Sequence, residues 1–103
     1  MQLFLWKISQ DVNNGWGTYD SAVVVAPESM SAAEVHPARY SDDGTAIYLF
    51  DRSLDSWVDA FDRVHAGVSS SWCDPSQVTV ICIGKAADHL KAGDVVCSSY
   101  NAG

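Results

Sequence analysis

Basic residues are scarce in this chain of 103 residues, which carries 6 Lys+Arg against 13 Asp+Glu and a formal net charge of −7. Proteins that bind DNA or RNA directly gather lysine and arginine on one face, and anionic membranes repel an acidic surface. We therefore expect neither direct nucleic-acid binding nor membrane binding. The acidic excess favours a basic protein partner, or a site that normally holds nucleic acid, because such a site attracts a negatively charged surface.

The motifs of the common enzyme classes are also missing. The sequence contains no GxSxG, P-loop or GxGxxG pattern, and no HExxH or CxxC. These patterns place a nucleophile, cradle a phosphate or bring metal ligands together. Cys73 beside Asp74 is a candidate nucleophile, but no activating base accompanies it. We expect no enzymatic activity, no cofactor and no metal.

Long apolar runs are absent as well. No basic segment followed by a long apolar run begins the chain, and no run approaches the length of a membrane span. The odd number of cysteines, without a CxxC, gives no disulfide framework. These features predict a reduced, cytoplasmic protein, and the length predicts a single domain over residues 1–103.

Hydrophobic periodicity divides the rest of the chain into strands and helices. Aromatic and branched residues predict strands at residues 3–8, 20–26, 78–83 and 95–100, with a weaker one at 45–50. A short helix is expected over residues 27–36, capped by Ser29 or Ser31, and a helical turn over residues 86–91.

A longer helix is expected over residues 51–65. One apolar stripe at the helical period predicts it, formed by Leu54, Trp57, Val58, Phe61 and Val64. The expected fold class is therefore α+β: a single antiparallel sheet of about four to five strands, with two helices packed on one face.

Acidic residues recur along this expected helix. Asp51, Asp55 and Asp59 stand at every fourth position, and Asp62 follows them. On a helix their carboxylates would stack about 6 Å apart, a pitch that imitates the negative edge of a nucleic-acid strand. A solvated helix face is the ordinary alternative for such a row.

Two tryptophans stand among turn residues. Trp16 lies between two glycines, and Trp72 lies in the turn before Pro75. Aromatic side chains on loops are frequent anchors of protein interfaces. The alternative is that each indole folds back over the core.

Several segments together resemble a family of small uncharacterised phage and prophage proteins. They are residues 5–10 (LWKISQ), 13–15 (NNG), 18–26 (TYDSAVVVA), 36–37 (HP) and 95–103 (VVCSSYNAG). The resemblance covers roughly residues 1–37 and 74–103, and residues 51–65 look like an insertion relative to shorter members. It carries no catalytic residues.

The resemblance implies a phage context, in which small acidic proteins without catalytic motifs are often inhibitors of host defence, such as anti-CRISPR proteins. We therefore expect a phage-encoded, non-enzymatic inhibitor, whose partner is a host protein or ribonucleoprotein complex with a basic groove. Charge would come from Asp51, Asp55, Asp59 and Asp62, and contact from Trp16 and Trp72. The alternative is a homo-oligomeric accessory or structural phage protein without an inhibitory role, for example a homodimer joined by the apolar second face of the strand at residues 3–8.

Overall fold

The computed structural model describes residues 2–12, 15–38, 48–59, 64–65 and 72–101. The elements are, in chain order, β1 (Phe4–Ser9), β2 (Thr18–Ala26), α1 (Ser29–Ala33), β3 (Tyr48–Asp51), β4 (Ser56–Asp59), β5 (Val64–His65), the 3-10 helix η2 (Pro75–Gln77), β6 (Thr79–Lys85) and β7 (Val95–Asn101).

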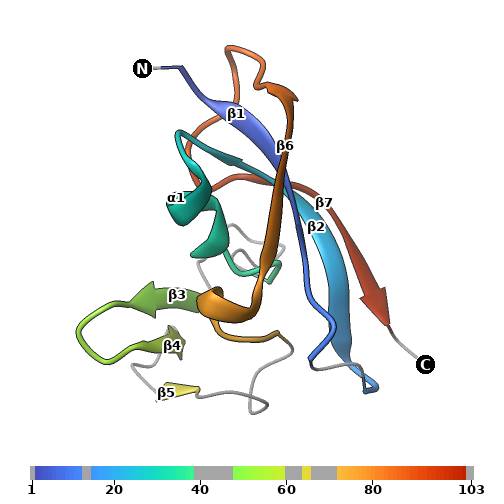
Figure 1. The fold of residues 1–103 in the computed structure, drawn as a ribbon, viewed down its shortest axis with the longest axis vertical. Helices are drawn as coiled ribbons and strands as arrows, with labels where there is room; N and C mark the ends of the chain where they lie inside the picture. Colours follow the sequence, from blue (N-terminus) through green and yellow to red (C-terminus); the bar gives the residue numbers. More distant parts are fainter. Residues whose placement is uncertain (1, 13–14, 39–47, 60–63, 66–71, 102–103) are drawn as a thin grey trace.

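Four of the strands form an antiparallel sheet in the order β6-β1-β2-β7. β1 and β2 form the expected hairpin, with Trp6 opposite Val24 and Ile8 opposite Ala22. β1 therefore occupies an inner position of this sheet, between β6 and β2. β6 and β7 form the two edges of this sheet, as Figure 1 shows.

The other three strands form a second antiparallel sheet in the order β3-β4-β5. Figure 1 shows this sheet and α1 on the same side of the four-stranded sheet. The prediction of an α+β fold with one sheet and two helices is therefore wrong. The fold is mostly β, with two sheets and, within the described ranges, one α-helix.

The helix predicted over residues 51–65 is wrong, because residues 51–59 belong to the β-hairpin of β3 and β4. Asp51 lies opposite Ser56 and Tyr48 opposite Asp59, and the chain turns between them, with Asp55 at φ 50°. Stacked aspartates disfavour a helix because like charges four residues apart repel. Their side chains also bond to nearby backbone N–H groups, which favours turns. The segments on either side then pair as strands, with Phe50 opposite Trp57.

The core lies between the two sheets and α1. Ile8, Val24 and Ala32 meet Trp57 and Trp72 in one buried cluster, so both sheets share the same core. Trp57 on β4 is fully buried, and its indole Nε1 donates to the Cys73 carbonyl at 2.9 Å. Burial of two indoles in one small core is a large hydrophobic contribution, because each removes roughly 150–250 Å² from water.

Two smaller expectations are corrected. α1 is only five residues long; its N-cap is Glu28, which makes no side-chain capping bond, so neither Ser29 nor Ser31 caps it. Where a helical turn was expected over residues 86–91, the chain makes one hydrogen-bonded turn: Leu90 donates its N–H to the Ala87 carbonyl at 3.0 Å.

Candidate functional site

The most exposed large hydrophobic side chain of the described residues is Trp16, at 81 % exposure. It lies on the loop that joins β1 to β2, at one end of the four-stranded sheet. An isolated exposed apolar residue is ordinary, but an exposed indole presents an unusually large apolar surface to water.

The backbone around Trp16 is fixed by hydrogen bonds on both sides. The Gly17 N–H donates to the Asn101 carbonyl at 2.8 Å, and the Gly15 carbonyl accepts the Thr18 hydroxyl at 2.6 Å. The Asn101 side-chain amide also donates to the Gly15 carbonyl, at 3.4 Å. These bonds connect the loop to the end of β7, so the backbone that carries the indole is held in place.

Glycine at position 17 is required by this geometry. Gly17 has φ 72°, in the left-handed region that residues with a Cβ avoid. A Cβ there would also meet the Tyr100 hydroxyl oxygen at 3.3 Å. The turn composition therefore explains how the loop brings Trp16 beside β7.

Two further apolar side chains are exposed at this end of the sheet. Val12 is 50 % exposed on the same loop, and Tyr100 is 54 % exposed on β7. Tyr100 rests on Tyr19, with ring centroids 4.8 Å apart. Burial, and then the neighbouring Tyr100 and Tyr48, raise the pKa of Tyr19. We name the set Val12, Trp16 and Tyr100 the loop patch.

Val12 and Tyr100 were not among the site residues predicted from the sequence. Tyr100 lies more than eighty positions after Trp16 in the chain, so only the pairing of β2 with β7 brings the two together. The one available sequence signal was the predicted strand at residues 95–100, which ends at Tyr100.

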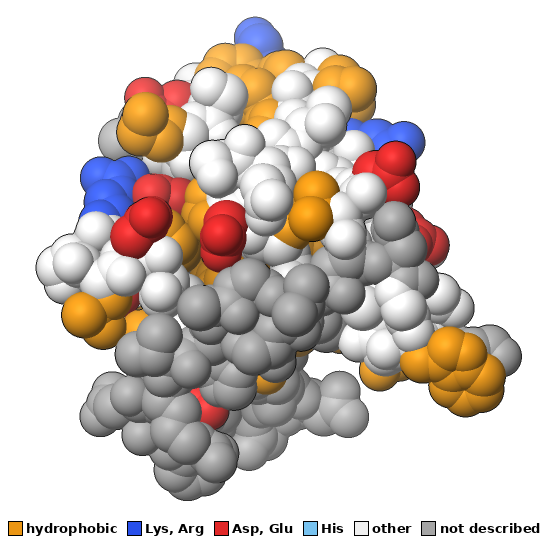
Figure 2. Space-filling view, turned by 60° about the horizontal axis from the view of Figure 1, so that its bottom comes forward, with side chains coloured by type: hydrophobic (Ala, Val, Ile, Leu, Met, Phe, Trp, Pro, Cys, Tyr) orange, Lys and Arg blue, Asp and Glu red, His pale blue; other side chains and the backbone are white. Residues whose placement is uncertain are grey.

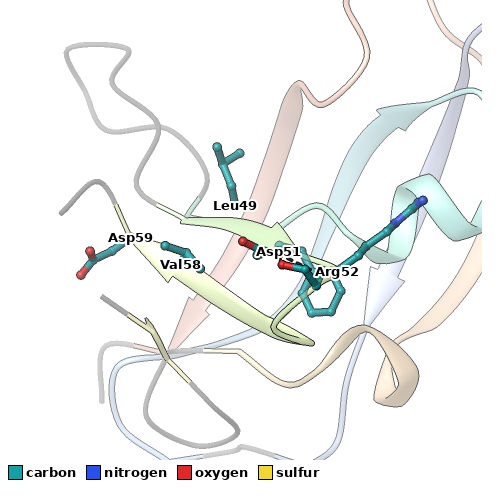
Figure 3. Close-up of a pocket in the computed structure, with 7 residues that line it drawn as sticks. Leu49, Asp51, Arg52, Val58 and Asp59 are labelled. Carbon is teal, nitrogen blue, oxygen red and sulfur yellow. Dashed lines mark hydrogen bonds between the residues drawn. The ribbon is translucent and has the colours of Figure 1, made fainter. Parts of the chain in front are cut away.

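The predicted acidic row does not form. Asp51 ends β3, Asp55 lies in the turn and Asp59 ends β4, opposite Tyr48; Asp62 lies outside the described residues. Figure 3 shows Asp51 at the turn end of the hairpin and Asp59 at the other end. On the face shown in Figure 2, acidic side chains form separate patches and no continuous row.

Asp51 has a structural role that the sequence reasoning missed. Its Oδ1 accepts bonds from the Ser53 N–H at 2.9 Å, the Ser53 hydroxyl at 2.5 Å and the Leu54 N–H at 3.3 Å. The Ser53 hydroxyl and then the Ser53 N–H lower the pKa of Asp51. This carboxylate closes the β3–β4 turn, because aspartate accepts from backbone groups two and three residues on.

A shallow hollow of about 550 Å³ lies on this hairpin, and its described lining includes Leu49, Asp51, Arg52, Val58 and Asp59. Figure 3 shows Arg52 reaching away from the hollow toward α1. There its guanidinium makes a bidentate pair with Glu34, at 2.7 Å and 2.9 Å. The Arg52 guanidinium is therefore not directed into the hollow.

Trp72 lies in the core, where it is fully buried. It surrounds His36 together with Trp57, Tyr48 and Tyr19, and the Tyr48 ring stacks on the imidazole at 4.4 Å. Of the two loop tryptophans, only Trp16 offers its indole to a partner. For Trp72 the alternative is confirmed: its indole packs into the core.

Cys73, the candidate nucleophile of the sequence, is not activated in the structure. Burial raises the pKa of the Cys73 thiol to about 11, and Asp74 contributes in the same direction. A thiol with a raised pKa is a poor nucleophile at neutral pH. Among the residues that the structure describes, no three histidine, cysteine or acidic side chains are placed to share a metal ion.

Comparison with known proteins adds no relative. No protein-family model, no curated protein and no solved structure matches the chain significantly. The resemblance to phage proteins therefore stays a prediction from the sequence segments that suggested it.

Helices of the described ranges are short: none is long and apolar enough to cross a membrane. The predicted cytoplasmic location stays a prediction.

Proposed function

We propose that this chain is a non-enzymatic protein-binding module whose loop patch, centred on Trp16, inserts into a partner. The observation that carries the proposal is an indole with 81 % exposure on a loop whose backbone is hydrogen-bonded on both sides. A loop whose backbone is already held by hydrogen bonds loses less conformational freedom on binding, so more of the burial energy of the indole is retained. Tryptophan is also enriched among residues that dominate interface energetics.

Charge supports a partner with a basic rim. Asp11 on the loop and Asp20 on β2 are exposed, and the whole chain carries a net charge of −7. Opposite charges around an apolar contact speed association and exclude other partners. The partner that we propose has an apolar pocket for the indole, bordered by lysine or arginine.

The resemblance to phage proteins supplies the biological form of the proposal: a phage inhibitor that occupies a basic groove of a host defence complex. In this form the loop patch replaces the acidic helix as the principal contact, because the described residues of the range 51–65 form strands and a turn. The aspartates of the β3–β4 hairpin are not needed for it.

The test compares matched variants in pull-downs from host lysate, followed by mass spectrometry. Trp16→Ala is expected to lower capture of the partner about thirtyfold, the effect of losing a hot-spot residue worth about 2 kcal/mol. Leu54→Ala is the control, because Leu54 is also exposed, at 54 %, but lies on the β3–β4 turn. Equal capture by the parent and Trp16→Ala would refute the proposal.

A second experiment separates the loop patch from the predicted acidic surface. Asp55→Lys with Asp59→Lys is expected to leave partner capture nearly unchanged, while Asp11→Lys with Asp20→Lys lowers it and makes it less sensitive to salt. The reverse pattern would indicate that the partner contacts the β3–β4 hairpin and not the loop patch.

A further inference from the structure

β6 forms an edge of the four-stranded sheet that no described strand covers. It pairs with β1 on one side, and the sheet ends there (Figure 1). Edge strands expose unpaired N–H and C=O groups, and proteins commonly guard them with charges. Residues 78–84 (VTVICIG) carry no charge, and Lys85 is the only charged residue of β6.

A bulge limits the regular part of this edge. Trp6 lies opposite Cys82 and Leu5 lies opposite Gly84, so Ile83 is an extra residue on β6. A bulge bends its strand and disrupts the ladder locally. Regular pairing with a further strand is therefore available along residues 78–82.

Exposed or groove-lining apolar side chains lie on both faces of the sheet at this edge. On the outer face of the sheet, Ile81 is 53 % exposed beside Lys7 of β1. On the inner side, a groove of about 520 Å³ runs between α1 and β6 and is lined in part by Met30, Val78 and Val80. Met30 is 64 % exposed. A strand added at this edge would place alternate side chains over the groove.

We propose that two copies of this chain dimerise by antiparallel pairing of their β6 strands, with Val80 opposite the same residue of the second copy. A two-fold axis through this pair closes the assembly, because each copy presents the same strand to the other. In this register Val78 lies opposite Cys82 and Thr79 lies opposite Ile81. Valine and cysteine then extend over both grooves, and the bulge stays outside the pairing.

Complementary charges at the two ends of β6 fit pairing with a second copy. Two chains of net charge −7 repel each other, but β1 and β6 contain no carboxylate. The antiparallel direction also brings the Lys85 end of one β6 toward the Asp74 end of the other. Glu34, which lines the groove, is already neutralised by its ion pair with Arg52.

The test is the molecular mass in solution, by sedimentation or light scattering, across the widest concentration range that solubility allows. The parent is expected to dimerise with concentration, because pairing over five residues is a small interface. Thr79→Lys with Ile81→Lys places like charges directly opposite one another, and is expected to weaken the dimer about tenfold or more.

The matched control is Val96→Lys with Ser99→Lys, which adds the same charge to β7, the other edge of the sheet. Circular dichroism confirms that all variants are folded; the four substituted side chains are exposed in the monomer. The control is expected to dimerise like the parent. A monomeric parent, or a control that dissociates as readily as the β6 variant, would overturn the proposal.

Cross-linking tests the register. Directly opposite residues of antiparallel strands have Cα atoms about 4.5–5.5 Å apart, which lies within the range that a disulfide spans. Val80→Cys combined with Cys82→Ser is therefore expected to give a covalent dimer on oxidation, and Cys82→Ser alone is expected not to. A stable dimer that fails to cross-link through position 80 would overturn this register. Trp16→Ala is expected to dimerise normally, so failure of the loop-patch proposal leaves this result unaffected.

Discussion

The imidazole of His36 stacks on the ring of Tyr48, with centroids 4.4 Å apart and planes 23° apart. His36 follows α1, and Tyr48 begins β3, so this contact joins the connection after α1 to the second sheet. Trp57 meets the same imidazole edge-on at 5.0 Å. The His36 Nδ1 accepts the Ala38 N–H at 2.9 Å, which requires that Nδ1 carries no proton. An aromatic cage around a histidine is thus the packing centre between the two sheets.

Substitutions of His36 are expected to separate ring packing from hydrogen bonding. His36→Phe retains an aromatic ring but loses the bond from Ala38, which is expected to lower the free energy of unfolding by about 1–3 kcal/mol. His36→Ala also leaves a cavity beside Tyr48 and is expected to cost more. Urea unfolding followed by circular dichroism measures both. Equal stabilities of the two variants would show that ring packing contributes nothing.

Gly17→Ala is expected to destabilise the protein by about 1–2 kcal/mol, because the left-handed backbone is unfavourable for any residue with a Cβ. The new methyl group also lies 3.3 Å from the Tyr100 hydroxyl, so the loop patch is expected to shift and partner capture to fall. Gly15→Ala is the control, since no atom lies within 4 Å of its added Cβ. Thermal unfolding compares the two, and a Gly15→Ala loss as large as that of Gly17→Ala would contradict the argument.

Labelling with a thiol reagent is expected to distinguish the cysteines. Cys82 and Cys97 are exposed, whereas Cys73 is buried with its pKa raised to about 11. Mass spectrometry of the native protein at mild alkaline pH is expected to show modification of Cys82 and Cys97, with Cys73 modified only after unfolding. Fast modification of native Cys73 would mean that this thiol is accessible and activated.

The same thiol predicts a loss of stability in alkali. In the unfolded chain Cys73 ionises near its ordinary pKa of 9.0, whereas the folded protein holds the proton up to about 11. A raised pKa in the folded state stabilises the protein fully below pH 9 and progressively less as the pH rises toward 11. Cys73→Ala is expected to weaken this pH dependence in urea unfolding between those two values. An identical alkaline profile would indicate that other groups cause it.

Asp51 predicts the opposite pH dependence, in acid. Its pKa lies below the ordinary value of 3.8 because the folded turn donates hydrogen bonds to the carboxylate. A lowered pKa stabilises the folded state above that value, and the contribution is lost as the pH falls through the folded pKa. Titration of the carboxyl carbon by NMR measures the shift directly. Ser53→Ala removes the hydroxyl donor and is expected to return the pKa toward its ordinary value, whereas Ser76→Ala, far from this turn in the sequence, is not.

The sequence alone determined the strands of the larger sheet. β1, β2, β6 and β7 contain runs of branched and aromatic residues bounded by turn residues, and these preferences act within a few positions of the chain. The hairpin of β1 and β2 followed for the same reason. The composition also determined the net charge of −7, whatever the fold.

Only the tertiary structure decided how Trp57 and the two loop tryptophans are used. Trp57 fits a helical stripe and an alternating strand equally well, and the choice followed from its burial against the other sheet. Trp16 and Trp72 stand in similar turn sequences, yet one is 81 % exposed and the other is fully buried. Burial depends on residues distant in the chain, so local sequence preference carries no information about it.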